Sequence, residues 1–366
     1  MANDEDPATK DRENRFVVLV REERSFLALL LLGFGVCALT YRTPSIAMWV
    51  GFALAGYAAV ANDSIQTIGT FIASNRNQKW WVLWLFIGAI WLATVTYSWV
   101  FYDGDVTYGR LTHKGFATAP TEFAFLQVAA PLFLLLLTRL RMPVSTSFLL
   151  LSCFATQASG VADVAIKSFA GYGVAFGTSI VVYLLLAKVF AGWFQGEPHP
   201  FWRPAQWVTS GLLWSVWIMQ DAANVAVFLP RSLSVWQFLP FAGVVFVGLG
   251  VLFRMGGERV QEVVDEKSSV VDVRQATVID LIYAVILYVF KVQSEVPMST
   301  TWVFIGLLAG RELAMGIRNT SGRSVREALR LMAIDFAKVT IGLIVSVVLA
   351  YTVNESFRTQ INALFG

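Results

Sequence analysis

Long runs of hydrophobic residues, separated by short polar stretches, fill most of this chain. An α-helix needs roughly 20 apolar residues to cross a membrane. Seven runs predict such crossings, at 26–41, 45–74, 80–102, 173–194, 205–230, 236–253 and 331–351. The pattern therefore predicts an all-α polytopic membrane protein with about seven full crossings.

Four further apolar stretches form two pairs, each pair separated by a segment that contains Pro, Ser and Thr. In the first pair, 121–140 and an arm that ends near 159 are separated by 141–147. In the second pair, 276–291 and 300–316 are separated by 293–301. Pro is suited to the start of a helix, and Ser and Thr are suited to its N-cap. We therefore expect two re-entrant hairpins whose tips lie inside the membrane. The arms are also long enough for ordinary transmembrane pairs, which is the alternative.

Two of the crossings contain a carboxylate flanked by carboxamides. The first has Asn62-Asp63 followed by Gln66, and the second has Gln220-Asp221 followed by Asn224. Both stretches have the spacing amide-Asp-x-x-amide, with Asn and Gln exchanged. An ionisable residue inside a membrane segment costs a few kcal/mol and usually marks a functional interior. We expect discontinuous helices here, broken near 62–63 and near 220–224.

The polar features recur with one period. Asp63 and Asp221 are about 158 positions apart, and Pro143 and Pro297 are about 154 apart. Each repeat would hold three crossings and a hairpin that returns to its own side, so the second copy must be inverted relative to the first. Two inverted repeats with broken helices that meet near the midplane are typical of secondary transporters.

Loop charges agree with this inverted arrangement. The expected inner segments, with the N-terminus inside, carry about 16 Lys and Arg against about 6 in the outer ones, as the positive-inside rule requires. We therefore expect a multi-pass protein of the cell membrane with a cytoplasmic N-terminus and an outer C-terminus. The expected segments are 1–25 (cytoplasmic), 26–172 (first span and repeat 1, with its hairpin tip at 141–147), 173–354 (linking span and repeat 2, with its hairpin tip at 293–301) and 355–366 (C-terminal tail).

Composition excludes several classes of function. The chain is 56% hydrophobic and 14% charged, far from the balance of a soluble domain. Its net charge of +3 is small, so nucleic acid is not an expected partner. Cys37 and Cys153 both lie in apolar segments and give no disulfide framework or metal motif. His113 and His199, the only histidines, are expected in loops, which argues against histidine-based catalysis and haem binding.

The motifs resemble those of the inorganic phosphate transporters of the PiT family, which are sodium- or proton-coupled symporters. The first half has Ala61-Asn62-Asp63, Gly69-Thr70 and Pro143-Val144-Ser145-Thr146-Ser147, and the second has Gln220-Asp221-Ala222-Ala223-Asn224 and Pro297-Met298-Ser299-Thr300-Thr301. The chain departs from the family pattern where Val60 and Val227 stand in place of glycines. This departure puts the substrate in question more than the fold. The resemblance implies a homodimer that carries phosphate together with Na⁺ or H⁺ and needs no other cofactor.

The chemistry of the motifs fits an oxyanion and a cation in one pocket. Helix N-termini and hydroxyls at the hairpin tips supply donors for a tetrahedral anion. The expected substrate-binding residues are Ser145, Thr146, Ser147, Ser299, Thr300, Thr301, Asn62 and Gln220. Carboxylates would repel the anion unless a cation, Na⁺ in the first place, lies between them. The expected cation ligands are Asp63, Asp221, Asn62, Gln66, Gln220 and Asn224.

Two other functions remain open from the sequence. The same fold could carry sulfate or another oxyanion, with H⁺ as the coupling ion. An aspartate can accept a hydrogen bond from protonated phosphate but not from sulfate, and this favours phosphate. An intramembrane aspartyl protease would also use two membrane aspartates. Neither aspartate stretch resembles the protease patterns Tyr-Asp and Gly-x-Gly-Asp, so we expect a transporter and not an enzyme. The bland alternatives are that the two aspartates only pin helix breaks and the hydroxyls only pack helices.

Overall fold

The computed structural model describes residues 7–112, 115–140, 142, 144–185, 196–255, 272–294, 296–318 and 324–365, and within them every regular element is helical. The helices are α1 (Pro7–Thr40), α2 (Pro44–Thr67), α3 (Gly69–Ser74), α4 (Trp80–Phe101), α5 (Phe125–Arg139), α6 (Ala158–Leu185), α8 (Trp202–Ala226), α9 (Val235–Met255), α11 (Val273–Gln293), α12 (Thr300–Arg318), α13 (Val325–Val353) and α14 (Glu355–Phe365). Short helical turns lie at η1 (Arg110–Thr112), η2 (Ser147–Leu151) and η3 (Ser152–Phe154). The predicted all-α fold is therefore confirmed.

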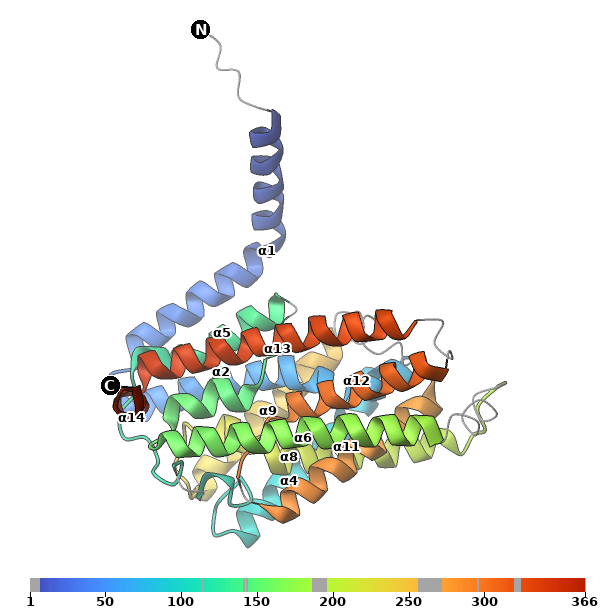
Figure 1. The fold of residues 1–366 in the computed structure, drawn as a ribbon. Helices are drawn as coiled ribbons and strands as arrows, with labels where there is room; N and C mark the ends of the chain where they lie inside the picture. The colour runs from blue at the N-terminus through green and yellow to red at the C-terminus, as the bar shows by residue number, and fades with distance from the viewer. Residues whose placement is uncertain are drawn as a thin grey trace.

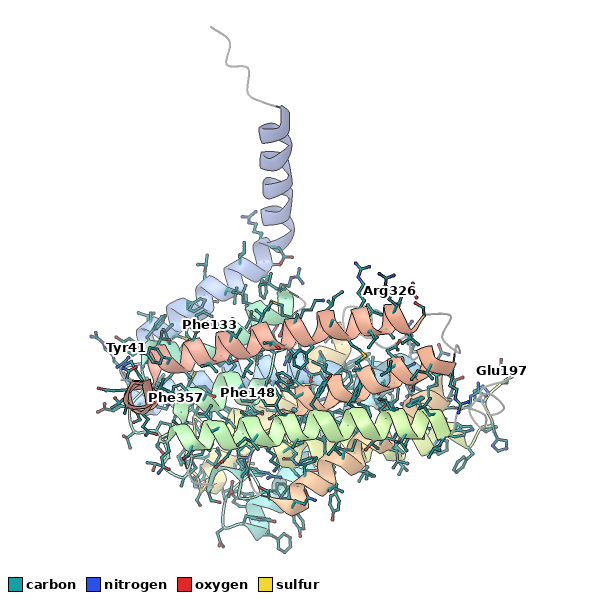
Figure 2. All side chains as sticks on the ribbon, viewed as in Figure 1. Tyr41, Phe133, Phe148, Glu197, Arg326 and Phe357 are labelled. Carbon is teal, nitrogen blue, oxygen red and sulfur yellow. The ribbon has the colours of Figure 1, made fainter. Side chains whose placement is uncertain are left out.

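The long helices run side by side in one bundle, and the N-terminal part of α1 projects away from it (Figure 1). The outer surface of the bundle is strongly apolar, with Leu31, Leu39 and Trp236 at 74%, 85% and 82% exposure. Figure 2 places Glu197 and Arg326 at one end of the bundle, and Tyr41 and Phe357 at the other. An apolar outer surface is what the hydrocarbon core of a bilayer requires.

Seven helices of the described part of the chain are long and apolar enough to cross a membrane. They contain Glu23–Thr40, Pro44–Asp63, Trp80–Phe101, Ala158–Leu185, Val235–Arg254, Val273–Lys291 and Val325–Val353. The number of crossing helices agrees with the prediction, but the set differs by one helix. It includes α11, which was predicted as a hairpin arm, and it does not include α8, which was predicted as a crossing. Helix α8 has 25 residues and is long enough, but its buried Gln206, Gln220, Asp221 and Asn224 make it too polar for this set.

The helices are not interrupted where the sequence placed the breaks. Helix α2 continues through Asn62 and Asp63 to Thr67, and after Ile68 a short α3 begins. Helix α8 continues through the whole of 220–224 to Ala226. The helical backbone therefore ends only after each polar stretch, at Ile68 in the first half and after Ala226 in the second. Side chains from other elements bond to the polar groups, so the helix need not be interrupted there.

The two hairpins have arms of very different length. In the first, α5 has 15 residues and the returning arm is only η2 and η3, which end at Phe154. In the second, α11 and α12 have 21 and 19 residues, or roughly 30 Å at 1.5 Å per residue. The first returning arm is too short to cross a bilayer, whereas both arms of the second are long enough. Arg141, Pro143 and Glu295, at the tips, lie outside the described residues.

One further boundary differs from the prediction, and the predicted tail has a helix of its own. Helix α6 begins at Ala158, so the stretch 160–172, expected between two elements, belongs to one long helix. The C-terminal tail, 355–366, is helical over Glu355–Phe365 and forms α14, which is seen end-on in Figure 1.

The packing of the two halves follows one scheme. Helix α2 packs against α5 as α8 packs against α11, and α2 contacts α9 as α8 contacts α4. The returning arm of each hairpin contacts the helix after it, η2 with α6 and α12 with α13. Helices α2 and α8 therefore have corresponding neighbours in the two halves.

Candidate functional site

Each hairpin tip begins a helical segment with a serine that accepts a hydrogen bond from the backbone three residues later. Phe148 N donates to Ser145 Oγ at 3.1 Å, and Trp302 N donates to Ser299 Oγ at 3.4 Å. This is the bond of an N-cap, and it satisfies one of the free N–H groups of the helix start. Ser145 and Ser299, both predicted to bind substrate, thus direct their hydroxyls to their own helical segments.

The threonine that follows each of these serines binds the aspartate of its own half. Thr146 Oγ1 lies 2.9 Å from both carboxylate oxygens of Asp63. Thr300 Oγ1 donates to Asp221 Oδ2 at 2.5 Å. Both aspartates are 2% exposed, so these bonds lie in the protein interior.

A side-chain amide completes the surroundings of each aspartate. Asn62 Nδ2 donates to Asp63 Oδ1 at 2.7 Å, and Asn224 Nδ2 donates to Asp221 Oδ1 at 2.8 Å. Ser147 Oγ also lies 3.2 Å from Asp221 Oδ1, and it shares its single O–H between this oxygen and Met298 O. Amide N–H groups can only donate, so in each pair the carboxyl oxygen is the acceptor.

The two tips are bound to each other by a reciprocal pair of hydrogen bonds. Ser147 Oγ donates to Met298 O at 3.1 Å, and Thr301 Oγ1 donates to Val144 O at 3.3 Å. In each bond the donor is the residue after the tip threonine, and the acceptor lies two residues before the threonine of the other tip. Each tip thus makes the same hydrogen bond to the other, as two copies do across a two-fold axis.

The two aspartates share one site. Thr146 binds Asp63, and its neighbour Ser147 binds Asp221. Consecutive Cα atoms are about 3.8 Å apart, so the two carboxylates approach adjacent positions of one tip. The two groups also interact electrostatically. Bringing two like charges together inside a membrane is unfavourable unless a cation joins them.

Three buried amide oxygens have no hydrogen-bond partner within the described part of the chain, namely Gln66 Oε1, Gln220 Oε1 and Asn224 Oδ1. Gln220 donates its amide nitrogen to Leu287 O at 2.9 Å, so its oxygen is the group left over. All three residues were predicted as cation ligands. A free carbonyl-type oxygen in the interior is a suitable ligand for a hard cation.

Asn62 differs from the other amides because its oxygen is already used. Thr138 Oγ1 donates to Asn62 Oδ1 at 3.2 Å, and Asn62 Nδ2 lies 3.2 Å from Val144 O. Asn62 therefore joins α2 to α5 and the first tip. No group of three or more His, Cys, Asp or Glu side chains gathers in the described residues, so the acidic part of the site is the two aspartates.

Two buried cations near the second tip were missed from the sequence. Arg110, in η1, and Lys167, in α6, both donate to the carbonyl oxygens of Ser294 and Val296; for Lys167 Nζ the distances are 2.9 and 2.6 Å. Arg110 Nε also donates to Met219 O, near the end of α8. The signal for Lys167 was a charge inside an apolar run, but this run was not expected to be helical. Nothing in the sequence around Arg110 separates it from an ordinary loop residue.

A small apolar cavity of about 10 Å³ is lined by residues of α2, α4, α8 and α9. Its lining, which includes Trp91, Trp214 and Trp217, presents no polar surface. A cavity of this kind cannot hold an ion, so the tips and the aspartates remain the candidate site.

Comparison with known proteins supports the fold. No family model matches the chain, and neither does any curated protein sequence. Among solved structures, a match is found to one described as "The sodium-dependent phosphate transporter", with 17% identity, a TM-score of 0.50, and coverage of 87% of this chain and 98% of that chain. At this identity the match shows a shared fold.

Proposed function

We propose that this protein is a secondary active transporter that couples the movement of a cation, Na⁺, to the symport of inorganic phosphate. The observation that carries the proposal is the pair Asp63 and Asp221, held by adjacent hydroxyls of one hairpin tip. The reciprocal bonds between the two tips support an arrangement of two inverted repeats, and the solved structure with the same fold is that of a phosphate transporter.

Cation binding explains how an acidic site takes an anion. Two carboxylates and the free amide oxygens of Gln66, Gln220 and Asn224 form a ligand set for a hard cation. At about 4 Å and an effective dielectric constant near 20, one pair of unit charges interacts with roughly 4 kcal/mol. A bound cation thus reverses the field that the anion meets. Linkage makes the effect reciprocal, so phosphate also raises the affinity for the cation.

The tip hydroxyls would then bind the anion when they leave their present partners. Ser147 and Thr301 now donate to backbone carbonyls of the opposite tip, and Thr146 and Thr300 donate to the aspartates. With the carboxylates bound to cations, these hydroxyls are free to donate to phosphate oxygens. Protonated phosphate also carries an O–H that an aspartate can accept, whereas sulfate does not. This difference favours phosphate.

The test is uptake of radiolabelled phosphate into proteoliposomes. We expect uptake driven by an inward Na⁺ gradient, and its loss in Asp63→Asn and Asp221→Asn, because removing one charge from a buried ionic cluster costs about 3 kcal/mol, roughly a hundredfold in affinity. Asp335→Asn, in the half-buried part of α13, is the control and should retain uptake. Uptake that ignores both Na⁺ and pH gradients would reject the proposal, and stronger competition by sulfate than by phosphate would change the substrate to sulfate.

A further inference from the structure

A third buried aspartate lies outside the site of the two tips. Asp280, in α11, is 1% exposed. Its Oδ1 accepts from Thr70 Oγ1, at the start of α3, at 2.7 Å, and its Oδ2 accepts from Ser210 Oγ, in α8, at 2.5 Å. Within the described residues Asp280 forms no salt bridge. One carboxyl group thus joins three helices without a cation to balance it.

A chain of buried polar side chains leads away from this carboxyl group. Gln206 Nε2 donates to Ser210 Oγ at 3.3 Å, and Asn75 Nδ2 donates to Gln206 Oε1 at 2.7 Å. Trp207 Nε1 donates to Asn75 Oδ1 at 2.9 Å. Gln206 and Asn75 are 0% and 3% exposed, so the chain passes through the interior to the loop that follows α3. It gives a polar connection between Asp280 and the end of the bundle.

The charged and titratable groups around Asp280 do not replace a counter-ion. Helices α3 and α8 present the hydroxyls of Thr70 and Ser210. From α6, Tyr183 interacts electrostatically with Asp280 and also with Arg311 and Glu312 of α12. Arg311 Nη1 bonds to Glu312 Oε1 at 3.2 Å, so its charge is balanced within α12.

The partners of Asp280 suit both states of its carboxyl group. A hydroxyl can donate to a carboxylate and can also accept from a carboxylic acid, so Thr70 and Ser210 can bond to Asp280 in either state. Each aspartate at the tips has, in addition to hydroxyl partners, one amide N–H donor, from Asn62 or Asn224. An unpaired carboxylate in an apolar interior is costly, and binding a proton removes that cost.

We propose that Asp280 is a proton-binding site that controls the association of α3, α8 and α11. In the closed arrangement of the structure the group is a carboxylic acid. When α3 and α8 separate and water reaches it, the O–H bond breaks, the proton passes to water as hydronium, and the electron pair stays on the carboxylate. Rebinding of a proton from the water allows the three helices to close again.

This site is connected to the tips through the end of α2. Thr70 lies just beyond the end of α2 at Thr67, whose hydroxyl donates to the backbone oxygen of Asp63 at 2.9 Å. Movement of α3 away from Asp280 therefore acts on the helix that carries Asp63. In its transport part the inference rests on the proposed function, and it adds a proton to the ions that control the cycle.

The proton itself can be detected without transport. In purified protein in lipid nanodiscs, infrared difference spectra between pH values separate the C=O stretch of a carboxylic acid from the bands of a carboxylate. We expect one carboxylic acid band that is absent in Asp280→Asn and unchanged in the control Asp335→Asn. Asn can both donate and accept at this position, so the variant should fold. Thr70→Val should keep the band and shift its frequency. Equal spectra for wild type and Asp280→Asn would overturn the proposal.

The transport part has its own test, the pH profile of phosphate uptake. One controlling proton changes the population of a state by up to about tenfold per pH unit. We expect the wild type to follow such a profile, and Asp280→Asn to retain uptake that changes less than about twofold over the same range. A pH profile in Asp280→Asn equal to that of the wild type would show that the proton on Asp280 does not control transport. Absence of any uptake by the wild type, with the infrared band present, would instead reject the phosphate transport and leave the proton site supported.

Discussion

At the scale of single residues, the site depends on hydroxyl groups more than on any other donor. Thr146 and Thr300 each bind one aspartate, and the next residue of each tip, Ser147 or Thr301, bonds to the opposite tip. A Ser and Thr cluster in a membrane segment can also serve helix packing alone. Here the hydroxyls meet carboxylates and the backbone of another hairpin, which a packing role does not require.

Replacing the tip threonines by valine removes the hydroxyl and keeps the shape. A hydrogen bond to a charged group contributes about 1.5–3 kcal/mol, so Thr146→Val and Thr300→Val should each weaken Na⁺ binding by roughly tenfold to a hundredfold. Isothermal titration of the purified protein measures this effect. Thr340→Val, whose hydroxyl bonds only to Phe336 O of its own helix, is the matched control and should bind Na⁺ normally. Equal Na⁺ affinities in all variants would show that the tip threonines do not take part in the proposed cation site.

Lys167 provides a second test at this scale. Its ammonium donates to Ser294 O and Val296 O, so Lys167→Met should loosen the turn that precedes the second tip. Hydrogen–deuterium exchange of a peptide covering 294–299 should rise several-fold, while a peptide from α9 should not change. Arg110 holds the same two oxygens, so the double change should have a larger effect than either single one. No increase in exchange would show that Lys167 does not hold the turn.

At the scale of elements, close packing of α12 on α6 fixes the second hairpin. A Cβ on Gly306 would lie 2.5 Å from Tyr172 O, and one on Gly310 would meet Phe176 O. These contacts are with backbone, which cannot move aside as a side chain can. The spacing Gly-x-x-x-Gly thus serves close helix contact, as it commonly does in membranes.

Adding a methyl group at either glycine should destabilise the bundle. Overpacking costs typically about 1–3 kcal/mol, so Gly306→Ala and Gly310→Ala should lower the melting temperature of the detergent-solubilised protein by several degrees. Gly173→Ala is the control, because a Cβ there meets nothing within 4 Å and alanine favours the helix. Its melting temperature should stay the same or rise. Equal stability of Gly306→Ala would mean that α6 and α12 do not pack as described.

The elements show how far sequence reasoning extends. The apolar runs predicted the helices, and the repeated polar stretches predicted which residues meet. The break near 62–63 was misplaced because a polar group in a helix can be satisfied by another element, here Thr146, which sequence order does not show. For the same reason the role of Asp280 was not predicted. Its partner Thr70 lies 210 positions earlier in the sequence, and its partner Ser210 lies 70 positions earlier.

At the scale of the whole molecule, we expect the two ends of the bundle to lie on opposite sides of the membrane. Glu197 and Arg326, from loops predicted to be inside, lie at one end, and Tyr41 and Phe357 lie at the other (Figure 2). From the loop charges and the positive-inside rule, we expect the end with Glu197 and Arg326 to be the inner one. This orientation is still a prediction.

Cysteine labelling can test the orientation. Cys37 and Cys153 are both buried, so the native thiols give little background with a membrane-impermeant maleimide. Thr359→Cys, exposed on α14, should react in intact cells. Asn77→Cys, exposed in the loop after α3, should react only after the cells are opened. The opposite pattern would place the N-terminus outside and invert the assignment of both hairpins.

The reciprocal bonds between the tips have a consequence for direction. Since each tip holds the other with the same kind of bond, opening towards either side of the membrane breaks equivalent contacts and meets a similar barrier. If the proposed transport function is right, the protein has no built-in preference for import over export. The direction of net flux is then decided by the concentrations on the two sides. Removing the Na⁺ gradient should therefore make vesicles that have accumulated phosphate release it through the protein.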